Sequence, residues 1–258
     1  MNRWDWVAGQ YRVFVTTSQT STQRRSLART AVVWDALVEV LAPLTEATVV
    51  DIGGGTGGFA VRVAELGHRV TVVDPNPDAL AILGRRAGER GVAERVTGIQ
   101  GDLAGVADLV APASADVVLC HGVLEIVEDP AAALSAIAAL LRPGGALSLL
   151  VQQRHAAVLA RAMAGHFSQA QALLELDAAT GAAVGRFSAE EIRRLIEGAG
   201  LGEPVLHAVR VFVDLVPSTL VDLEPGAADA LVALERAASA RAEYLALAAQ
   251  IHALAYKG

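Results

Sequence analysis

The sequence predicts a doubly wound α/β fold, in which helices cover both faces of a mostly parallel sheet. From residue 47 short runs of β-branched residues alternate with alanine-rich helical stretches, which is typical of such a sheet. The first run leads directly into a glycine-rich turn at residues 53–58. The length of 258 residues is ample for one domain of this kind with additions.

The core elements follow in a regular order. Strands are predicted near 47–52, 69–74, 95–100, 115–120 and 145–152, and helices near 57–66, 77–90, 103–109 and 130–142. Asp74-Pro75-Asn76-Pro77 and Asp129-Pro130 are helix-start signals for the second and fourth helices. Arg142-Pro143-Gly144-Gly145 should end the fourth helix and turn the chain into the fifth strand.

The flanking segments are predicted to be mainly helical. Residues 1–45, with an amphipathic stretch from Gln23 to Leu41, are expected to form an N-terminal helical lid. Residues 46–258 would then form the main domain, with helical insertions at about 155–200 and 226–243. Further strands are expected near 204–214 and 249–256. Since no internal repeat or low-complexity linker divides the chain, these additions should pack onto one core.

Composition narrows the classes of protein. No run of about eighteen apolar residues is free of charge, and residues 1–6 lack an apolar signal core, so we expect a cytoplasmic protein without a membrane span. The net charge of −7 argues against a broad basic surface for nucleic acid, although it leaves a local patch open. Lys257 is the only lysine. Cys120 lies in a valine-leucine run and is expected to be a buried thiol.

The glycine-rich turn predicts a site for a nucleotide-like cofactor. Glycines let a ligand lie against the backbone amides that open the next helix. Two cofactors fit the pattern. Gly53, Gly55 and Gly58 match the G-x-G-x-x-G pattern of dinucleotide sites, while the Asp-x-Gly-x-Gly core that begins at Asp51 also suits S-adenosylmethionine.

Residues at the predicted strand ends bear on this choice, because ligands of doubly wound sheets lie beyond the carboxyl ends of the strands. Asp51 can hold the turn or approach, through water, the cationic amino-acid moiety of S-adenosylmethionine, and it suits a pyrophosphate poorly. Asp74 can accept hydrogen bonds from both ribose hydroxyls of either cofactor, and Pro75 offers a flat apolar surface for adenine.

The third and fourth strand ends add further candidates. Asp102 can accept a hydrogen bond from the adenine amino group while Leu103 packs on the ring, and His121 follows the fourth strand. Each residue also has a structural explanation: Asp74 as a helix cap, Asp102 as a turn residue and His121 as a structural histidine. Their common position at successive strand ends favours a shared ligand.

The sequence lacks the motifs that mark several other classes of enzyme. The Tyr-x-x-x-Lys pair of short-chain dehydrogenases is absent, which makes a dinucleotide-dependent dehydrogenase a distant alternative. No Cys-x-x-Cys, His-Glu-x-x-His or Gly-x-Ser-x-Gly motif indicates a metal or hydrolytic centre, so we expect no metal.

Residues 45–152 resemble the class I S-adenosylmethionine-dependent methyltransferases. The resemblance rests on Asp51, Asp74 and Asp102 at the strand ends and on the segments His121-Gly-Val-Leu-Glu125 and Arg142-Pro-Gly-Gly145. That resemblance implies a Rossmann-like fold and S-adenosyl-L-methionine as the cofactor. A narrower resemblance, to bacterial tRNA 5-carboxymethoxyuridine methyltransferases, rests on separated segments. These are 27–34, 121–130, 141–148, His155, 163–167, 210–212 and 251–252.

The narrower resemblance implies a set of cofactor contacts. Arg29 would reach the carboxylate of the cofactor's methionine, with Gly53 and Gly54 beneath it. Gly55 and Gly57 of the same turn are also expected to contact the cofactor. The nucleoside would lie among the residues named above at the second, third and fourth strand ends. Two departures separate the chain from that family: residues 168–185 hold no cation, and Gln152-Gln153 replace a Tyr-Asn pair.

Methyl transfer from a sulfonium needs in-line geometry and exclusion of water, so it requires no catalytic residue. A carboxylate acceptor is already ionised and needs only a cation to orient it, for which Arg25, Arg154 and Arg210 are candidates. His155 could act as a base for a hydroxyl acceptor. Each of these four side chains could equally be a structural or surface residue.

Three functions therefore stay open. The first is esterification of the carboxylate of a wobble uridine in tRNA, which the narrower resemblance implies. The second is O- or N-methylation of a small metabolite in an enclosed pocket, which the acidic net charge and the scarcity of lysine favour. The third is a cofactor-binding module without turnover.

Overall fold

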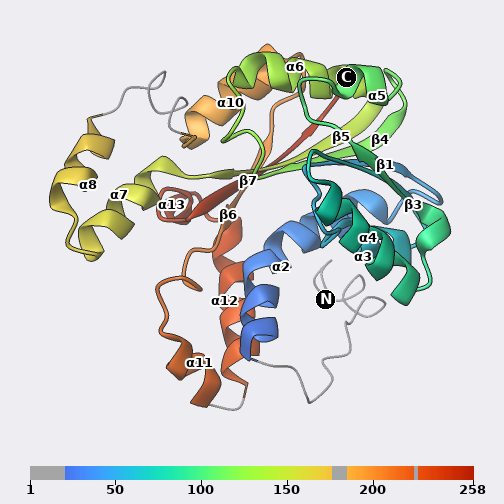
Figure 1. The fold of residues 1–258 in the computed structure, drawn as a ribbon. Helices are drawn as coiled ribbons and strands as arrows, with labels where there is room; N and C mark the ends of the chain where they lie inside the picture. Colours follow the sequence, from blue (N-terminus) through green and yellow to red (C-terminus); the bar gives the residue numbers. More distant parts are fainter. Residues whose placement is uncertain (1–20, 176–184, 224–225) are drawn as a thin grey trace.

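The computed structural model describes residues 21–175, 185–223 and 226–258, which form a seven-stranded sheet with helices on both faces (Figure 1). The predicted fold class, a doubly wound and mostly parallel Rossmann-like sheet, is confirmed. The strand order is β3-β2-β1-β4-β5-β7-β6. The strands are β1 (Thr48–Ile52), β2 (Arg69–Asp74), β3 (Val96–Gln100), β4 (Ala115–His121), β5 (Leu141–Gln152), β6 (Val205–Val209) and β7 (Gln250–Tyr256).

The direction of the strands creates one ligand-facing edge. β1 to β5 pair in parallel, while β7 is antiparallel to both β5 and β6, so β6 runs in the same direction as β5. The chain winds from β1 outward to β3 and then returns to place β4 on the other side of β1. This reversal places the topological switch point between β1 and β4, and open α/β sheets bind ligands in the crevice outside the carboxyl ends of the strands at such a point.

Each face of the sheet has its own apolar core. α5 (Val106–Leu109), α6 (Pro130–Leu140) and α10 (Ala189–Gly198) lie on one face, where Ile137 and Ile192 pack with Val118. α2 (Ser21–Leu41), α3 (Ala60–Glu65) and α4 (Pro77–Glu89) lie on the other, where Leu37 and Leu83 are fully buried. The burial of Cys120 is confirmed, and burial raises the pKa of its thiol.

Several element bounds differ from those predicted, for reasons visible in the backbone. α3 begins at Ala60 rather than near 57, because the glycine turn continues to Gly57, where φ is +79°. β5 begins at Leu141 and takes in the Arg-Pro-Gly-Gly segment, with a register irregularity opposite Ala115 and Val117. β6 ends at Val209 because the next residue, Arg210, has φ +60°, which is incompatible with an extended strand.

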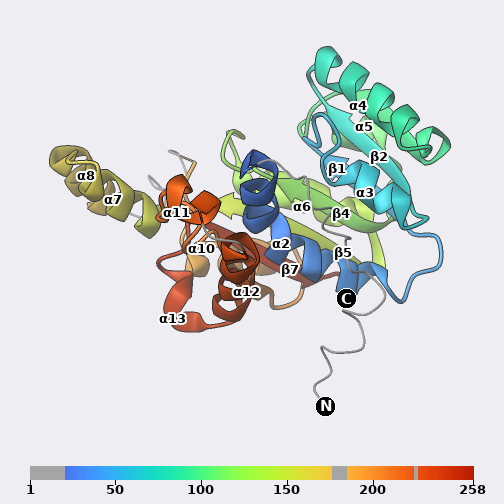
Figure 2. The ribbon, with the colours of Figure 1, turned by 90° about the horizontal axis from the view of Figure 1, so that it is seen from below.

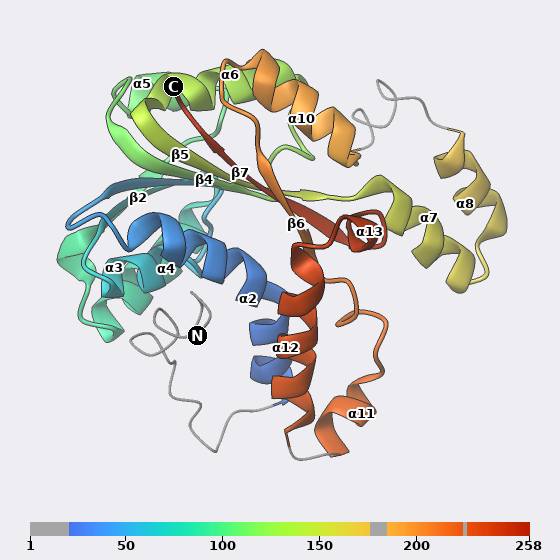
Figure 3. The same ribbon diagram turned by 180° about the vertical axis from the view of Figure 1, so that it is seen from behind.

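The later helices form two groups. α7 (Arg154–Met163) and α8 (Phe167–Leu174) make a hairpin that projects beyond the sheet in Figures 1 and 2. α11 (Ser218–Leu223), α12 (Ala227–Ser239) and α13 (Ala242–Leu245) follow β6. α12 lies beside α2, as Figures 1 and 3 show, and Arg236 pairs with Asp35 across this contact at 2.6 Å.

The expected N-terminal lid is described only from residue 21, and residues 1–20 lie outside the described part of the chain. α2 packs onto the sheet through Leu37 and Leu41 as one of its covering helices. The division at residue 45 and the lid role stay predictions. Among the helices that the structure describes, none has the length and apolar character needed to cross a bilayer.

Lys257, which follows β7, forms hydrogen bonds with the C-terminal end of α6. Its Nζ donates to the carbonyl oxygens of Ala138 at 2.8 Å and Leu141 at 2.7 Å, at the end of that helix. The last carbonyls of a helix have no partner within the helix, and a nearby cation also complements the negative end of the helix dipole. The only lysine of the chain is therefore a C-terminal cap for α6.

We expect Lys257→Met to lower the free energy of unfolding by about 1–3 kcal/mol, because it leaves two partly buried carbonyls without their charged donor. Urea denaturation followed by circular dichroism measures this difference. Arg85→Met is the matched control, since Arg85 is exposed and only 3.9 Å from Glu89, and it should change the value by less than about 0.5 kcal/mol. Equal losses in the two variants would contradict the capping role.

Candidate functional site

The glycine turn lies at the end of β1, in the crevice between β1 and β4. Gly53, Gly55 and Gly57 all have positive φ, between +53° and +79°. Gly54 has a different constraint, because a Cβ at this position would lie 2.5 Å from Oδ2 of Asp51. The turn thus needs glycine both for its backbone angles and because a carboxylate packs directly against it.

Asp51 is a buried carboxylate without a donor among the described residues. The residue is 3% exposed, and within the described ranges no hydrogen bond to its carboxylate is among the influences on its pKa. Burial, and secondarily the nearby charge of Asp74, raise the pKa of Asp51 to about 7. A cationic group at this point would remove the unfavourable burial of an unpaired charge, so the site suits a ligand with positive charge.

Asp74 fixes the turn from the end of β2. Its Oδ2 accepts a hydrogen bond from the amide of Gly55 and its Oδ1 one from the amide of Asn76, both at 2.9 Å. The side chain of Asn76, rather than that of Asp74, caps α4. Each carboxylate oxygen keeps a further lone pair, so the predicted contacts with ribose hydroxyls stay available. Pro75 is exposed beside it.

The third strand end differs from the simplest expectation. Asp102 is exposed and its Oδ1 accepts from the amide of Gly105 at 3.0 Å, which makes it a turn residue with one free oxygen. Leu103 is only 4% exposed and packs in the core with Val73 and Val106. The predicted cofactor contacts of both residues stay predictions, and little of the Leu103 side chain is open to a ligand.

His121, at the end of β4, faces the same side of the sheet as Asp51. Its ring meets Phe59 edge to face with 4.9 Å between centroids, and its Nε2 lies 2.9 Å from Oγ of Ser148. Its other nitrogen, Nδ1, is buried and has no partner among the described residues. Burial lowers the pKa of His121 to about 4, so the ring is neutral at pH 7. The end of β4 thus holds a buried, uncharged nitrogen whose hydrogen-bonding capacity is not used by the described residues.

Two of the predicted arginines converge at the carboxyl edge of the sheet. Arg29 on α2 and Arg210 after β6 both bind Asp214, with Nη2–Oδ distances of 2.8 and 2.5 Å. The three groups together carry one net positive charge. Glu235 on α12 positions the loop that follows Arg210. Its buried carboxylate accepts hydrogen bonds from the backbone amides of residues 211–213 at 2.7–2.9 Å.

The remaining substrate candidates lie at the start of α7. Arg154 forms an ion pair with Glu191 of α10 at 3.0 Å, so its guanidinium joins two helices. His155 is exposed. Arg25 belongs to α2, but its side chain lies outside the described residues. The structure does not bring these three residues to the Arg29–Asp214–Arg210 cluster by any contact that it describes, and their substrate roles stay predictions.

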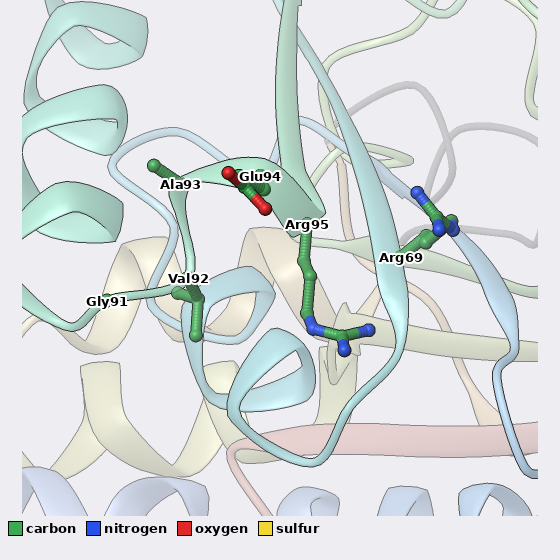
Figure 4. Close-up of a pocket in the computed structure, with 6 residues that line it drawn as sticks. All are labelled: Arg69, Gly91, Val92, Ala93, Glu94 and Arg95. Carbon is green, nitrogen blue, oxygen red and sulfur yellow. The ribbon is translucent and has the colours of Figure 1, made fainter.

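A separate cavity lies at the opposite edge of the sheet. It has a volume of about 360 Å³, and Figure 4 shows its lining: Arg69, at the start of β2, and residues 91–95, which lead into β3. These are amino ends of strands, whereas the glycine turn and His121 lie at carboxyl ends. Both arginines of this cavity also pair with Glu46. The cavity is therefore remote from the candidate site.

Sequence reasoning missed several residues of this region. Ser148, His207, Asp214 and Glu235 were not singled out, although a serine in a valine-leucine strand is a signal of a buried polar contact. Across the described ranges, no group of three or more His, Cys, Asp or Glu residues has the arrangement of a metal site.

The comparisons with known proteins agree with this geometry. Residues 23–202 match the family described as "Methyltransferase domain". The tRNA 5-carboxymethoxyuridine methyltransferase of Escherichia coli K12 is 35% identical over 147 residues, which are 56% of this chain and 56% of that protein. The ubiquinone biosynthesis O-methyltransferase of Xanthomonas euvesicatoria is 37% identical over 124 residues, 47% of this chain and 50% of that protein. The chain thus spans about half the length of the curated relatives it matches.

Solved structures share the fold. A possible histamine N-methyltransferase from Thermotoga maritima superposes with a TM-score of 0.57 at 22% identity, covering 92% of this chain and 94% of that one. At this identity the likeness speaks for the fold alone.

The raised pKa of Asp51 predicts a specific pH dependence of stability. In the folded protein Asp51 keeps its proton up to about pH 7, whereas the ordinary pKa of an aspartate is 3.8. Between these pH values the unfolded chain releases the proton and the folded protein keeps it, so the free energy of unfolding falls as pH rises. Asp51→Asn should therefore gain roughly 1–4 kcal/mol over the native chain as pH rises from 4 to 7, and hold that gain above pH 7. Denaturant titrations across pH measure the difference, with exposed Asp78→Asn as the control. A difference that is flat with pH for Asp51→Asn would contradict the assignment.

Proposed function

We propose that this chain, which belongs to the methyltransferase-domain family, transfers the methyl group of S-adenosylmethionine to a carboxylate acceptor. The coarse activity, S-adenosylmethionine-dependent methyl transfer, follows from family membership together with the carboxyl-edge residues. We propose 5-carboxymethoxyuridine at the wobble position of tRNA as the first candidate acceptor. That proposal is supported by the relative in Escherichia coli and by the arginine cluster at the same edge of the sheet.

The residues of the crevice suit this cofactor. Asp51 offers a buried, unpaired carboxylate to a cationic group, and Gly54 leaves no side chain above it. Asp74 keeps lone pairs for two hydroxyl groups, and Pro75 is exposed for an aromatic ring. S-adenosylmethionine carries an ammonium and a sulfonium, a ribose and an adenine, and it supplies an activated methyl group when it is bound. A pyrophosphate would instead be repelled by Asp51.

The protein's own contribution is positioning. A carboxylate acceptor is ionised at neutral pH and needs no base, but it must be oriented in line and shielded from water. Arg210 is the arginine of this pair that we assign to the acceptor, since the narrower resemblance places Arg29 at the cofactor's methionine carboxylate. The two arginines carry one net positive charge after Asp214 is counted, which attracts an anionic acceptor. Glu235 fixes the backbone that carries Arg210. This convergent arginine pair is the observation that carries the proposal.

A second candidate is O- or N-methylation of a small metabolite. His121 suits it in the tautomer whose Nδ1 carries a lone pair, because that buried, unpartnered nitrogen can then accept a hydrogen bond from a hydroxyl or an amine. The composition also favours it: the net charge is −7, and the single lysine is occupied in capping α6 rather than available for phosphates. The similarity to ubiquinone biosynthesis O-methyltransferases over 124 residues points the same way.

We expect Asp74→Ala to weaken S-adenosylmethionine binding by at least about 100-fold, because it removes the acceptor for the ribose hydroxyls and frees the amide of Gly55. Isothermal titration calorimetry measures the affinity, and circular dichroism checks that the variant is folded. Asp78→Ala, an exposed acidic residue in the first turn of α4, should bind normally. Near-normal affinity in Asp74→Ala would show that the ribose assignment is wrong.

Nucleoside analysis of tRNA separates the two acceptors. In a strain lacking the gene, the methyl ester of 5-carboxymethoxyuridine should disappear and the free acid should accumulate. The native gene should restore the ester, as should Arg194→Ala, which alters an exposed arginine of α10. Arg210→Ala should restore it about 10- to 100-fold less efficiently, as expected for loss of a charge-assisted contact. Unchanged ester in the deletion strain would exclude the tRNA acceptor and leave the metabolite.

A further inference from the structure

Four polar side chains form a continuous chain of contacts across the sheet. Nε2 of His121 on β4 lies 2.9 Å from Oγ of Ser148 on β5, which lies 2.9 Å from Nε2 of His252 on β7. Nδ1 of His252 in turn lies 3.1 Å from Nδ1 of His207 on β6. The rings of His252 and His207 are stacked, with 5.2 Å between centroids. The strand register explains the alignment, because His121 and His252 both pair with Leu150, and His207 pairs with His252.

The two middle groups of this chain of contacts are buried and its rings are uncharged. Ser148 and His252 are fully buried, whereas His121 and His207 at the two ends are partly exposed. Burial lowers the pKa of all three histidines, and for His252 the neighbouring histidines lower it further. Within the described residues, these four side chains form their hydrogen bonds with one another and not with an acidic side chain. No counter-charge therefore stabilises an imidazolium there.

Neutral rings make the hydrogen bonds directional. A neutral histidine has one N–H and one lone-pair nitrogen, and the hydroxyl of Ser148 has one proton to donate. If Ser148 donates to His121, it must accept from Nε2–H of His252, which then accepts from Nδ1–H of His207. If Ser148 donates to His252, every one of these bonds is reversed. Only these two arrangements satisfy all three contacts.

We propose that Ser148, His252 and His207 form a proton relay for His121, which sets whether Nδ1 of His121 donates or accepts a hydrogen bond. The three are positioning residues, and the role of the relay in methyl transfer rests on the proposed function. One arrangement presents an N–H to a carboxylate acceptor. The other presents a lone pair to a hydroxyl or an amine.

The relay also moves a proton without charging a buried ring. When an acceptor hydroxyl or amine gives its proton to Nδ1 of His121, the Nε2 proton of His121 passes to Ser148 and the hydroxyl proton of Ser148 passes to Nε2 of His252. The Nδ1 proton of His252 passes to Nδ1 of His207, and the Nε2 proton of His207 leaves to water. One bond to hydrogen breaks at the acceptor and one forms at water, and all three rings end neutral.

The two ends of the chain fit these roles. Nδ1 of His121 is buried and is the end without a protein partner among the described residues, and His121 ends β4, which pairs with the strand that carries Asp51. His207 lies on the outermost strand and is partly exposed, which makes it the end of the relay from which we propose that a proton leaves to water. A merely structural hydrogen-bond cluster would not need an unpartnered nitrogen at one end and solvent access at the other.

Nitrogen NMR of the protein labelled with ¹⁵N-histidine tests the relay without cofactor or acceptor. Ser148→Ala should change the side-chain shifts of His207, which Ser148 does not contact. Nδ1 and Nε2 of His207 should move in opposite directions, since this paired shift marks a change of tautomer rather than a loosening of the fold. Ser135→Ala, an exposed serine that donates to Ala131 of the same helix, is the matched control and should leave all three rings unchanged.

The reciprocal variant starts at the exposed end. His207→Phe keeps a ring on His252 but removes the Nδ1 partner, and it should produce the paired shift at His121, three groups away. Coupling in both directions supports the relay. If either variant folds and leaves the distant ring unchanged, the relay is overturned. Because no S-adenosylmethionine is present, this result is independent of whether the proposed function is correct.

Discussion

Asp51 is a carboxylate buried against the glycine turn, and its position restricts which residues can occupy the turn and the end of β2. An unpaired buried charge is costly, and here the cost appears as a pKa raised to about 7. The turn must be glycine because Asp51 fills the space that a Cβ at Gly54 would need. Asp74 must then hold the amide of Gly55, since the turn has few side chains to stabilise it. A fold that tolerates such a residue at the end of β1 gives up stability there, as expected if Asp51 has the cation-binding role proposed above.

The parts of this site that the sequence predicted are those set by local pattern. Each strand of a parallel sheet ends at the same edge, so Asp51, Asp74 and His121 could be placed together from the alternation of strands and helices alone. The glycine turn could likewise be predicted locally, because glycine is the residue type that readily adopts the positive φ angles of the turn. The bounds that were wrong, at the start of α3 and the end of β6, depend on positive φ values at Gly57 and Arg210.

What sequence reasoning missed depends on contacts between distant segments. Arg29 meets Asp214 across 185 positions of the chain, and nothing in either local sequence marks them as partners. The partners of His121 likewise follow from the register of β7, an antiparallel strand inserted between two others. A shift of one residue in that register would turn His252 to the other face. The charge cluster and the histidine chain thus became visible only with the tertiary structure.

The position of β7 has a consequence for the order in which the molecule can assemble. β6 joins the sheet only through β7, which follows it in the chain by some forty residues. While the protein is being synthesised, β5 therefore presents an unpaired edge until residues 250–256 have left the ribosome. An exposed strand edge of this kind invites pairing with other chains. The nascent chain should thus be most vulnerable to aggregation just before β7 emerges, when most of the core described above is already formed.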